Sequence, residues 1–216
     1  MFFPTLCNLQ KCLIQKITDK SSDIVPQGAQ PIFVYYLVMN NQMPISEINS
    51  TEEMLDLVDE NDQVIGSLSR KEIYAQGLRN FRVVNAFIKN SEGKLWMPIR
   101  TASKKLYPST LDFSVAGHVE SGETYEEALL KESREEINLD LNIIPYTEIA
   151  YLDPRKHLVG AFQKVYEIKS DIAPDYNPED FSSYEWLSPE EIVARAEAGE
   201  VMKSDILKAI KICYLS

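Results

Sequence analysis

Apolar residues recur along positions 53–216 with two different spacings. Short runs rich in Val, Ile, Phe and Tyr between turn residues indicate β-strands, whereas apolar residues at every third or fourth position indicate α-helices. The pattern predicts a hairpin over 53–70, a second hairpin from strands 81–89 and 94–100, further strands at 111–116, 143–152, 158–168 and 181–187, and helices at 71–76, 124–137, from Ser188 onward, and at 203–215.

Strands mixed with one mid-chain helix and with C-terminal helices predict an α+β fold. The length of 216 residues suits one domain at 53–216 preceded by an N-terminal extension at 1–52. The longest apolar run, PIFVYYLVM at 31–39, lies in that extension and is far shorter than the ~20 residues that cross a membrane. We interpret it as a strand that needs a sheet edge, on the domain or on a second copy in a homodimer.

Composition narrows the classes of partner. The chain is 44% hydrophobic and 25% charged, as in ordinary soluble domains, and its formal net charge is -11. Such an acidic surface repels phosphate backbones, so we expect no nucleic-acid polymer as a partner, although a bound cation would still allow a small phosphorylated substrate. The three cysteines lack metal-binding spacing, and no basic segment precedes a long apolar run at the start. We therefore expect a reduced, cytoplasmic protein without a membrane anchor.

The predicted helix at 124–137 carries an acidic face. Thr124 can cap this helix, with Glu127 three residues later completing a capping box. Glu132, Glu135 and Glu136 are spaced i, i+3 and i+4, so their carboxylates share one face and repel each other. Taken alone, such a run is most often a solvated helix face. The alternative is a site for a hard divalent cation, Mg²⁺ or Mn²⁺, which prefers oxygen ligands.

A glycine-bracketed turn before this helix favours the second alternative. Gly117 and Gly122 enclose what reads as a tight loop between the strand 111–116 and the helix, and glycines in such a turn suggest unusual backbone angles. The strand, the loop and the acidic helix together resemble the Nudix hydrolase family, whose pattern is G-x5-E-x7-R-E-U-x-E-E-x-G-U, with U aliphatic. The positions that match are Gly117, Glu123, Glu132, Glu135, Glu136 and Leu139.

Three positions depart from the family pattern without removing a candidate ligand. Lys131 stands in place of the arginine and keeps the charge but not the planar fork. Ser133 replaces the aliphatic residue on the face that, with Leu130 and Ile137, should pack on a core. Asn138 replaces the glycine and can end a helix in the left-handed conformation.

The resemblance implies a Nudix fold over 53–216, a mixed sheet sandwiched between helices. It also implies an enzyme that cleaves a nucleoside diphosphate derivative at its phosphoanhydride with the help of Mg²⁺ or Mn²⁺. The family precedent makes Glu132, Glu135, Glu136 and the carbonyl of Gly117 the expected metal ligands. It makes Glu132 the candidate general base and Glu123 a supporting group that fixes the loop.

Basic residues upstream of the acidic helix are candidates to bind the substrate phosphates. They are Arg82, Arg100, Lys104 and Lys105. Lone Lys and Arg side chains are more often solvated surface, so this assignment is weaker than that of the glutamates. No further motif selects a substrate, and we expect free nucleoside di- or triphosphates because the acidic surface and the compact length leave little room for a polymer platform.

Two alternative functions come with the same fold. The arrangement around Gly117 and His118 also looks like isopentenyl-diphosphate isomerase, which needs a cysteine before this pair and two more upstream histidines. Here Ala116 takes the cysteine position, and the only other histidine is His157, far downstream. The second alternative is a non-catalytic nucleotide sensor, a class that commonly loses box carboxylates. All four are present here, which favours catalysis.

Overall fold

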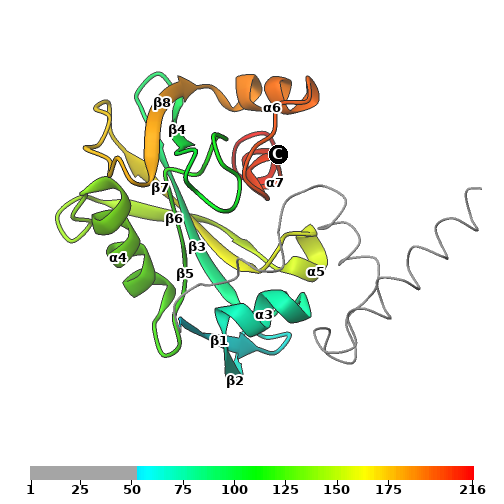
Figure 1. The fold of residues 1–216 in the computed structure, drawn as a ribbon. Helices are drawn as coiled ribbons and strands as arrows, with labels where there is room; N and C mark the ends of the chain where they lie inside the picture. The colour runs from blue at the N-terminus through cyan, green and yellow to red at the C-terminus, as the bar shows by residue number, and fades with distance from the viewer. Residues whose placement is uncertain (1–52) are drawn as a thin grey trace, which may run out of the picture.

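The computed structural model describes residues 53–216, so the expected strand at 31–39 lies outside the described residues (Figure 1). The predicted first hairpin is confirmed: β1 (Met54–Val58) and β2 (Val64–Ser69) pair antiparallel as a separate two-stranded sheet. The predicted short helix follows as α3 (Arg70–Gln76), capped by the Ser69 side chain. This hairpin and α3 form one wall of the site described below.

The remaining strands form one mixed six-stranded sheet in the order β6-β7-β3-β4-β8, with β5 also paired to β3. Only the β3–β7 pair is parallel. The strands are β3 (Arg82–Lys89), β4 (Leu95–Arg100), β5 (Val115–His118), β6 (Tyr146–Leu152), β7 (Phe162–Lys169) and β8 (Phe181–Leu187).

Helices cover both faces of this sheet (Figure 1). On β3, Val84, Ala86 and Ile88 belong to a core that includes residues of α4 (Tyr125–Ile137). Phe87 belongs instead to a second core that includes residues of α6 (Pro189–Glu197) and α7 (Ile206–Tyr214). A strand buried on both faces reads as a nearly continuous apolar run, which is the pattern of 81–89. The predicted α+β fold, a mixed sheet between helices, is confirmed.

Helix α4 begins and ends where the local chemistry predicts. The Thr124 side chain accepts a hydrogen bond from the Glu127 backbone while the Glu127 side chain accepts one from the Thr124 backbone, so the capping box is confirmed. At the other end Asn138 adopts the left-handed conformation with φ of 50°. Ser133 and Ile137 are fully buried. The acidic residues of the same helix, Glu132, Glu135 and Glu136, line a pocket beside β5.

A fork in the sheet makes room for a pocket. Strands β4 and β5 share one edge of β3, because β4 pairs near Ile88 and β5 pairs with the stretch from Val83 to Ala86. Ser114 bridges the fork: its hydroxyl accepts a hydrogen bond from the Ile88 backbone (2.8 Å) and donates one to the Trp96 carbonyl (2.7 Å). The outer edge of β5 is left without a partner strand among the described residues.

The bounds predicted for the strand before the acidic helix were wrong. The strand expected at 111–116 is β5, which begins only at Val115 and includes Gly117 and His118, so His118 is not in the loop. Leu111 makes only single bridges to neighbouring segments. Between β6 and β7 lies the one-turn helix α5 (Pro154–His157), capped by the Asp153 side chain, which the sequence pattern did not predict. None of the helices within 53–216 has the length and apolar character of a membrane span.

Candidate active site

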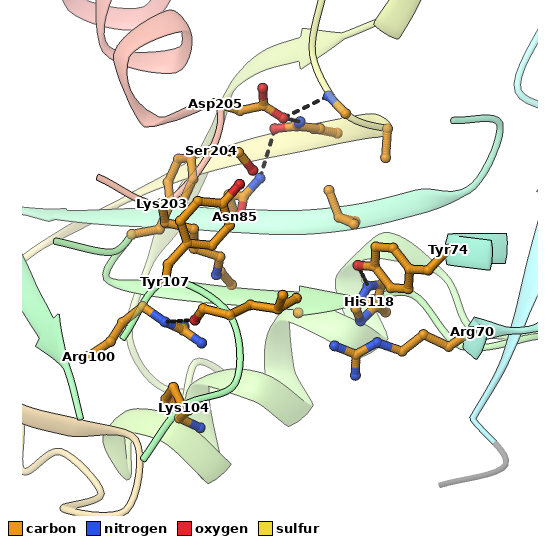
Figure 2. A pocket seen from close by; sticks show the side chains of 18 of the residues that line it. Arg70, Tyr74, Asn85, Arg100, Lys104, Tyr107, His118, Lys203, Ser204 and Asp205 are labelled. Carbon is orange, nitrogen blue, oxygen red and sulfur yellow. Dashed lines mark hydrogen bonds between the residues drawn. The ribbon is translucent and has the colours of Figure 1, made fainter. Parts of the chain in front are cut away.

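A pocket of about 870 Å³ lies at the fork, beside the outer edge of β5 (Figure 2). Its walls come from the β1–α3 region, the segment 100–110, β5, the acidic face of α4 and the segment 201–205. Most of the site residues expected from the sequence line it, namely Gly117, Glu132, Glu135, Glu136, Arg100, Lys104 and Lys105. Glu123 and Arg82 are not among its lining residues.

The carboxylates of α4 reach the exposed edge of β5. The Ala116 backbone N–H donates to Glu136 Oε2 at 3.0 Å, an edge bond that no strand uses. The Glu132 carboxyl lies against Gly117 so closely that a Cβ at that glycine would sit 2.1 Å from Glu132 Cδ. Gly117 is therefore required for close approach. The positive φ expected of this turn occurs at Gly122, where φ is 86°.

Burial of these carboxylates alters their protonation. Burial raises the pKa of Glu132 to about 7, with the Glu135 charge adding to the shift and Lys131 opposing it. Burial also raises the pKa of Glu136 to about 8, against the opposing charge of Lys203. Like charges drawn into one partly dry site are stabilised by a cation, and their hard oxygen donors suit Mg²⁺ or Mn²⁺.

The carboxylates of α4 suit a divalent cation because they are oxygen donors and because they line the same pocket. Between residues 53 and 216, no three His, Cys, Asp or Glu side chains already form a group that could hold a metal ion. Glu132, Glu135 and Glu136 line one pocket from one helix face, and their oxygens would converge on an ion only after rotamer changes.

Glu123 lies outside the pocket and contacts Lys131, the residue directly before Glu132. The Lys131 ammonium contacts Glu120 Oε1 at 2.7 Å and Glu123 Oε1 at 3.1 Å. The Glu123 carboxylate also accepts a hydrogen bond from the Glu120 backbone at 3.0 Å, which closes the turn before α4. These contacts tie the turn before α4 to the residue that precedes Glu132.

A cluster that the sequence did not reveal lines the wall opposite α4. His118 Nδ1 lies 3.3 Å from Glu53 Oε1, and its Nε2 lies 2.9 Å from the Tyr74 hydroxyl. Arg70 also pairs with Glu53 at 2.9 Å. Burial lowers the pKa of His118, so the ring is neutral at neutral pH, with Nδ1–H donating to Glu53 and Nε2 accepting from Tyr74. Burial raises the pKa of Glu53, but the hydrogen bonds of His118 and Arg70 outweigh it and hold the value at about 2.

The basic wall consists of cations that already have acidic neighbours. Arg100 pairs with the buried Asp112 at 2.5 Å, and Lys203, which pattern analysis missed, contacts the same carboxylate at 2.9 Å. Lys104 pairs with Asp180. Figure 2 shows Arg100, Lys104 and Lys203 on one side of the pocket and Arg70 and His118 on the other.

The structure does not bring Arg82 to this pocket. Its guanidinium pairs with Asp62 at 2.6 Å, in the turn between β1 and β2, and stacks over the Tyr125 ring. His157, the second histidine of the chain, is also elsewhere: in α5 its Nδ1 accepts a hydrogen bond from the Asp153 backbone at 2.9 Å. The metal cage of an isomerase therefore lacks its histidines among the described residues.

A mixed sheet between helices, with the acidic helix α4 beside the strand that carries Gly117, defines an α+β domain. The NUDIX domain family model matches residues 79–208. The chain belongs to the Nudix family, and it is a pyrophosphohydrolase of the kind that acts on nucleoside diphosphate derivatives.

Three individual comparisons bear on this assignment. The chain is 54% identical over 162 residues to an uncharacterised Nudix hydrolase of Nostoc sp. (strain PCC 7120), covering 75% of this chain and 96% of that protein. A crystal structure from Deinococcus radiodurans matches with a TM-score of 0.71 and 46% identity, over 75% of this chain and 99% of the other. The isopentenyl-diphosphate Delta-isomerase of Kocuria rhizophila is a weaker match, 23% identical over 69% of this chain and 86% of that enzyme.

Proposed function

We propose that this protein hydrolyses the phosphoanhydride bond of free nucleoside di- or triphosphates, with Mg²⁺ or Mn²⁺ as the cofactor. The observation that carries the proposal is the meeting, in one pocket, of the acidic face of α4 and a wall of cations around Gly117. A nucleotide polyphosphate needs both, because its oxygens bind cations and its cleavage needs their negative charge neutralised.

Glu132, Glu135, Glu136 and the Gly117 carbonyl would hold the divalent ion. When bound, such an ion supplies charge neutralisation and a water of lowered pKa. Glu132 is the residue best placed to take the proton of an attacking water, since its carboxyl lies against the Gly117 backbone where the two walls meet. Glu123 supports catalysis as a positioning residue through Lys131.

Arg100, Lys104 and Lys105 are the proposed phosphate ligands. Asp112 holds Arg100, and Asp180 holds Lys104, so these side chains are positioned before a ligand enters. A substrate phosphate would add to these contacts as a further acceptor. We exclude Arg82 from this role because its guanidinium is committed to Asp62, away from the pocket.

The size and charge of the site favour a small substrate. A volume of about 870 Å³ is within the range of pockets that enclose a nucleotide-sized ligand. The net charge of -11 opposes the approach of a polyanionic chain over a wide surface. Free nucleotides meet both conditions.

The test is phosphate release from a panel of nucleoside di- and triphosphates with Mg²⁺, compared between the wild type and Glu136→Gln. We expect the substitution to lower kcat by about 10²-fold or more, because it removes one of the carboxylates that would hold the ion. Glu126→Gln is the matched control: Glu126 is on the same helix, bonds to Tyr166 outside the pocket, and should leave turnover unchanged.

Two outcomes would contradict the proposal. Turnover that survives Glu136→Gln unchanged would refute the assignment of the acidic face. Absence of turnover on every nucleotide, with tight binding retained, would favour the nucleotide sensor instead.

A further inference from the structure

Two buried amides and one partly buried carboxylate form a hydrogen-bonded chain in the pocket wall. Asn85 Nδ2 donates to Gln163 Oε1 at 2.9 Å, and Gln163 Nε2 donates to Asp205 Oδ2 at 2.8 Å. The dashed lines of Figure 2 follow this chain from Asn85 to Asp205. Asn85 and Gln163 are only 5% and 2% exposed, and all three residues line the pocket. The phosphate chemistry proposed above uses none of them.

The direction of this chain is fixed by its last member. A carboxylate only accepts hydrogen bonds, so Gln163 must turn its NH₂ group toward Asp205 and its oxygen toward Asn85. The Gly160 backbone N–H donates to the same Asp205 oxygen at 2.7 Å, and Lys208 pairs with the other oxygen at 3.4 Å. Asn85 must therefore turn its NH₂ group toward Gln163.

This leaves a fixed acceptor on the pocket side. Among residues 53–216, no hydrogen bond to Asn85 Oδ1 is present, and this oxygen is not one of the fully buried polar atoms that lack a partner, so it is open to the pocket. Asn85 pairs with Ala116 across β3 and β5, next to Gly117, so its amide lies one residue from the acidic site. An acceptor that is held in one orientation and open to the pocket is available to a donor on a bound ligand.

We propose that Asn85, oriented by Gln163 and Asp205, is a specificity-determining residue that reads the base of the nucleotide. The inference rests on the proposed function in that it takes the ligand to be a nucleotide. The amide offers the Oδ1 acceptor beside its second N–H donor. The complementary edge is an amino group beside a ring nitrogen, as in adenine and cytosine. Tyr107 lines the same pocket and offers a ring on which a base can stack.

A base with a carbonyl in place of the amino group places its oxygen against Asn85 Oδ1. Two hydrogen-bond acceptors then face each other, and no hydrogen bond forms. The cleanest test therefore compares pairs that differ only at this group: ADP with IDP, and CDP with UDP. We expect kcat/KM of the wild type to favour the amino member of each pair by about 10- to 100-fold. Dissociation constants of AMP and IMP, measured by calorimetry, test the same preference without turnover.

Three variants separate recognition from stability. Asn85→Leu removes the amide that contacts the base. Gln163→Met keeps nearly the same side-chain volume but removes the hydrogen bond that orients this amide. Both variants should bring the ratio of kcat/KM between the amino and the carbonyl nucleotide close to one. Asp205→Asn is the matched control. The Gly160 and Gln163 donors meet at one oxygen of Asp205, so an asparagine at position 205 must also turn its oxygen toward them. The preference for amino over carbonyl bases should therefore survive in this variant. Thermal unfolding of each variant shows whether it is folded.

The outcomes distinguish this inference from the proposed function. A wild type that hydrolyses nucleotides with no preference within either pair overturns the base-reading role. So does a preference that persists in both folded Asn85→Leu and folded Gln163→Met. A protein without turnover that still binds AMP more tightly than IMP, in a manner lost in Asn85→Leu, supports the reader and refutes the hydrolytic proposal.

Discussion

Replacing Gly117 by alanine would test whether the acidic site depends on the close approach of a side chain to a strand. A Cβ at position 117 would lie 2.1 Å from Glu132 Cδ and 2.2 Å from Glu132 Oε1. Ordinary contact begins near 3.4 Å, so the Glu132 carboxyl must retreat by about 1.3 Å (3.4 Å minus 2.1 Å). A misplacement of ~1 Å at a catalytic group costs about 10²-fold in rate.

Folding should change little in the same variant. Gly117 is within β5, where alanine is favoured over glycine by roughly 0.5–1 kcal/mol, and a displaced Glu132 rotamer costs about the same. We therefore expect a free energy of unfolding within about 1 kcal/mol of the wild type, which for a domain of this size is a shift in Tm of about 2–4 °C.

The assay is kcat/KM with Mg²⁺ on the best nucleotide of the panel, together with thermal unfolding. Gly66→Ala is the matched control: Gly66 also lies in a strand, β2, and a Cβ there would meet nothing within 4 Å. The expected result is a loss of about 10²-fold for Gly117→Ala alone, with both variants folded. Activity of Gly117→Ala within twofold of the wild type would refute the reasoning, because Glu132 would then work equally well from a displaced position.

Three further predictions concern buried titratable side chains. In metal-free protein, the pKa values of Glu132 (about 7) and Glu136 (about 8) exceed the unfolded value of 4.5. The free energy of unfolding should therefore fall as pH rises from about 5 to 8, and it should fall less steeply with Mg²⁺. A Tm that does not change with pH in EDTA would contradict this. Asp112→Ala, which leaves two cations facing each other without their buried acid, should cost about 3–5 kcal/mol in urea unfolding, and a cost below about 1 kcal/mol would mean that the pair is not buried. Burial raises the pKa of the Cys213 thiol to about 12, so, with the two N-terminal cysteines replaced by serine, its reaction with a disulfide reagent at pH 8 should be slow until urea unfolds the protein.

The sequence by itself determined the parts of this protein that are encoded locally. Helix α4, its Thr124 cap, its left-handed end at Asn138 and its acidic face all follow from residues within one stretch of the chain. The same stretch carries the family pattern, so the fold class could be predicted as well. Helix periodicity and capping act over three to four residues, which is why pattern analysis reads them reliably.

The partners of each side chain were decided only by the tertiary structure. Nothing near Arg82 in the chain indicates that Asp62, 20 residues earlier, engages its guanidinium. Likewise, Asn85 and Gln163 are 78 residues apart, and a parallel strand pair brings them together. Hydrophobic spacing says which face of a strand is buried, but not which polar groups meet there. That depends on strand order and register, which form only when distant segments pack.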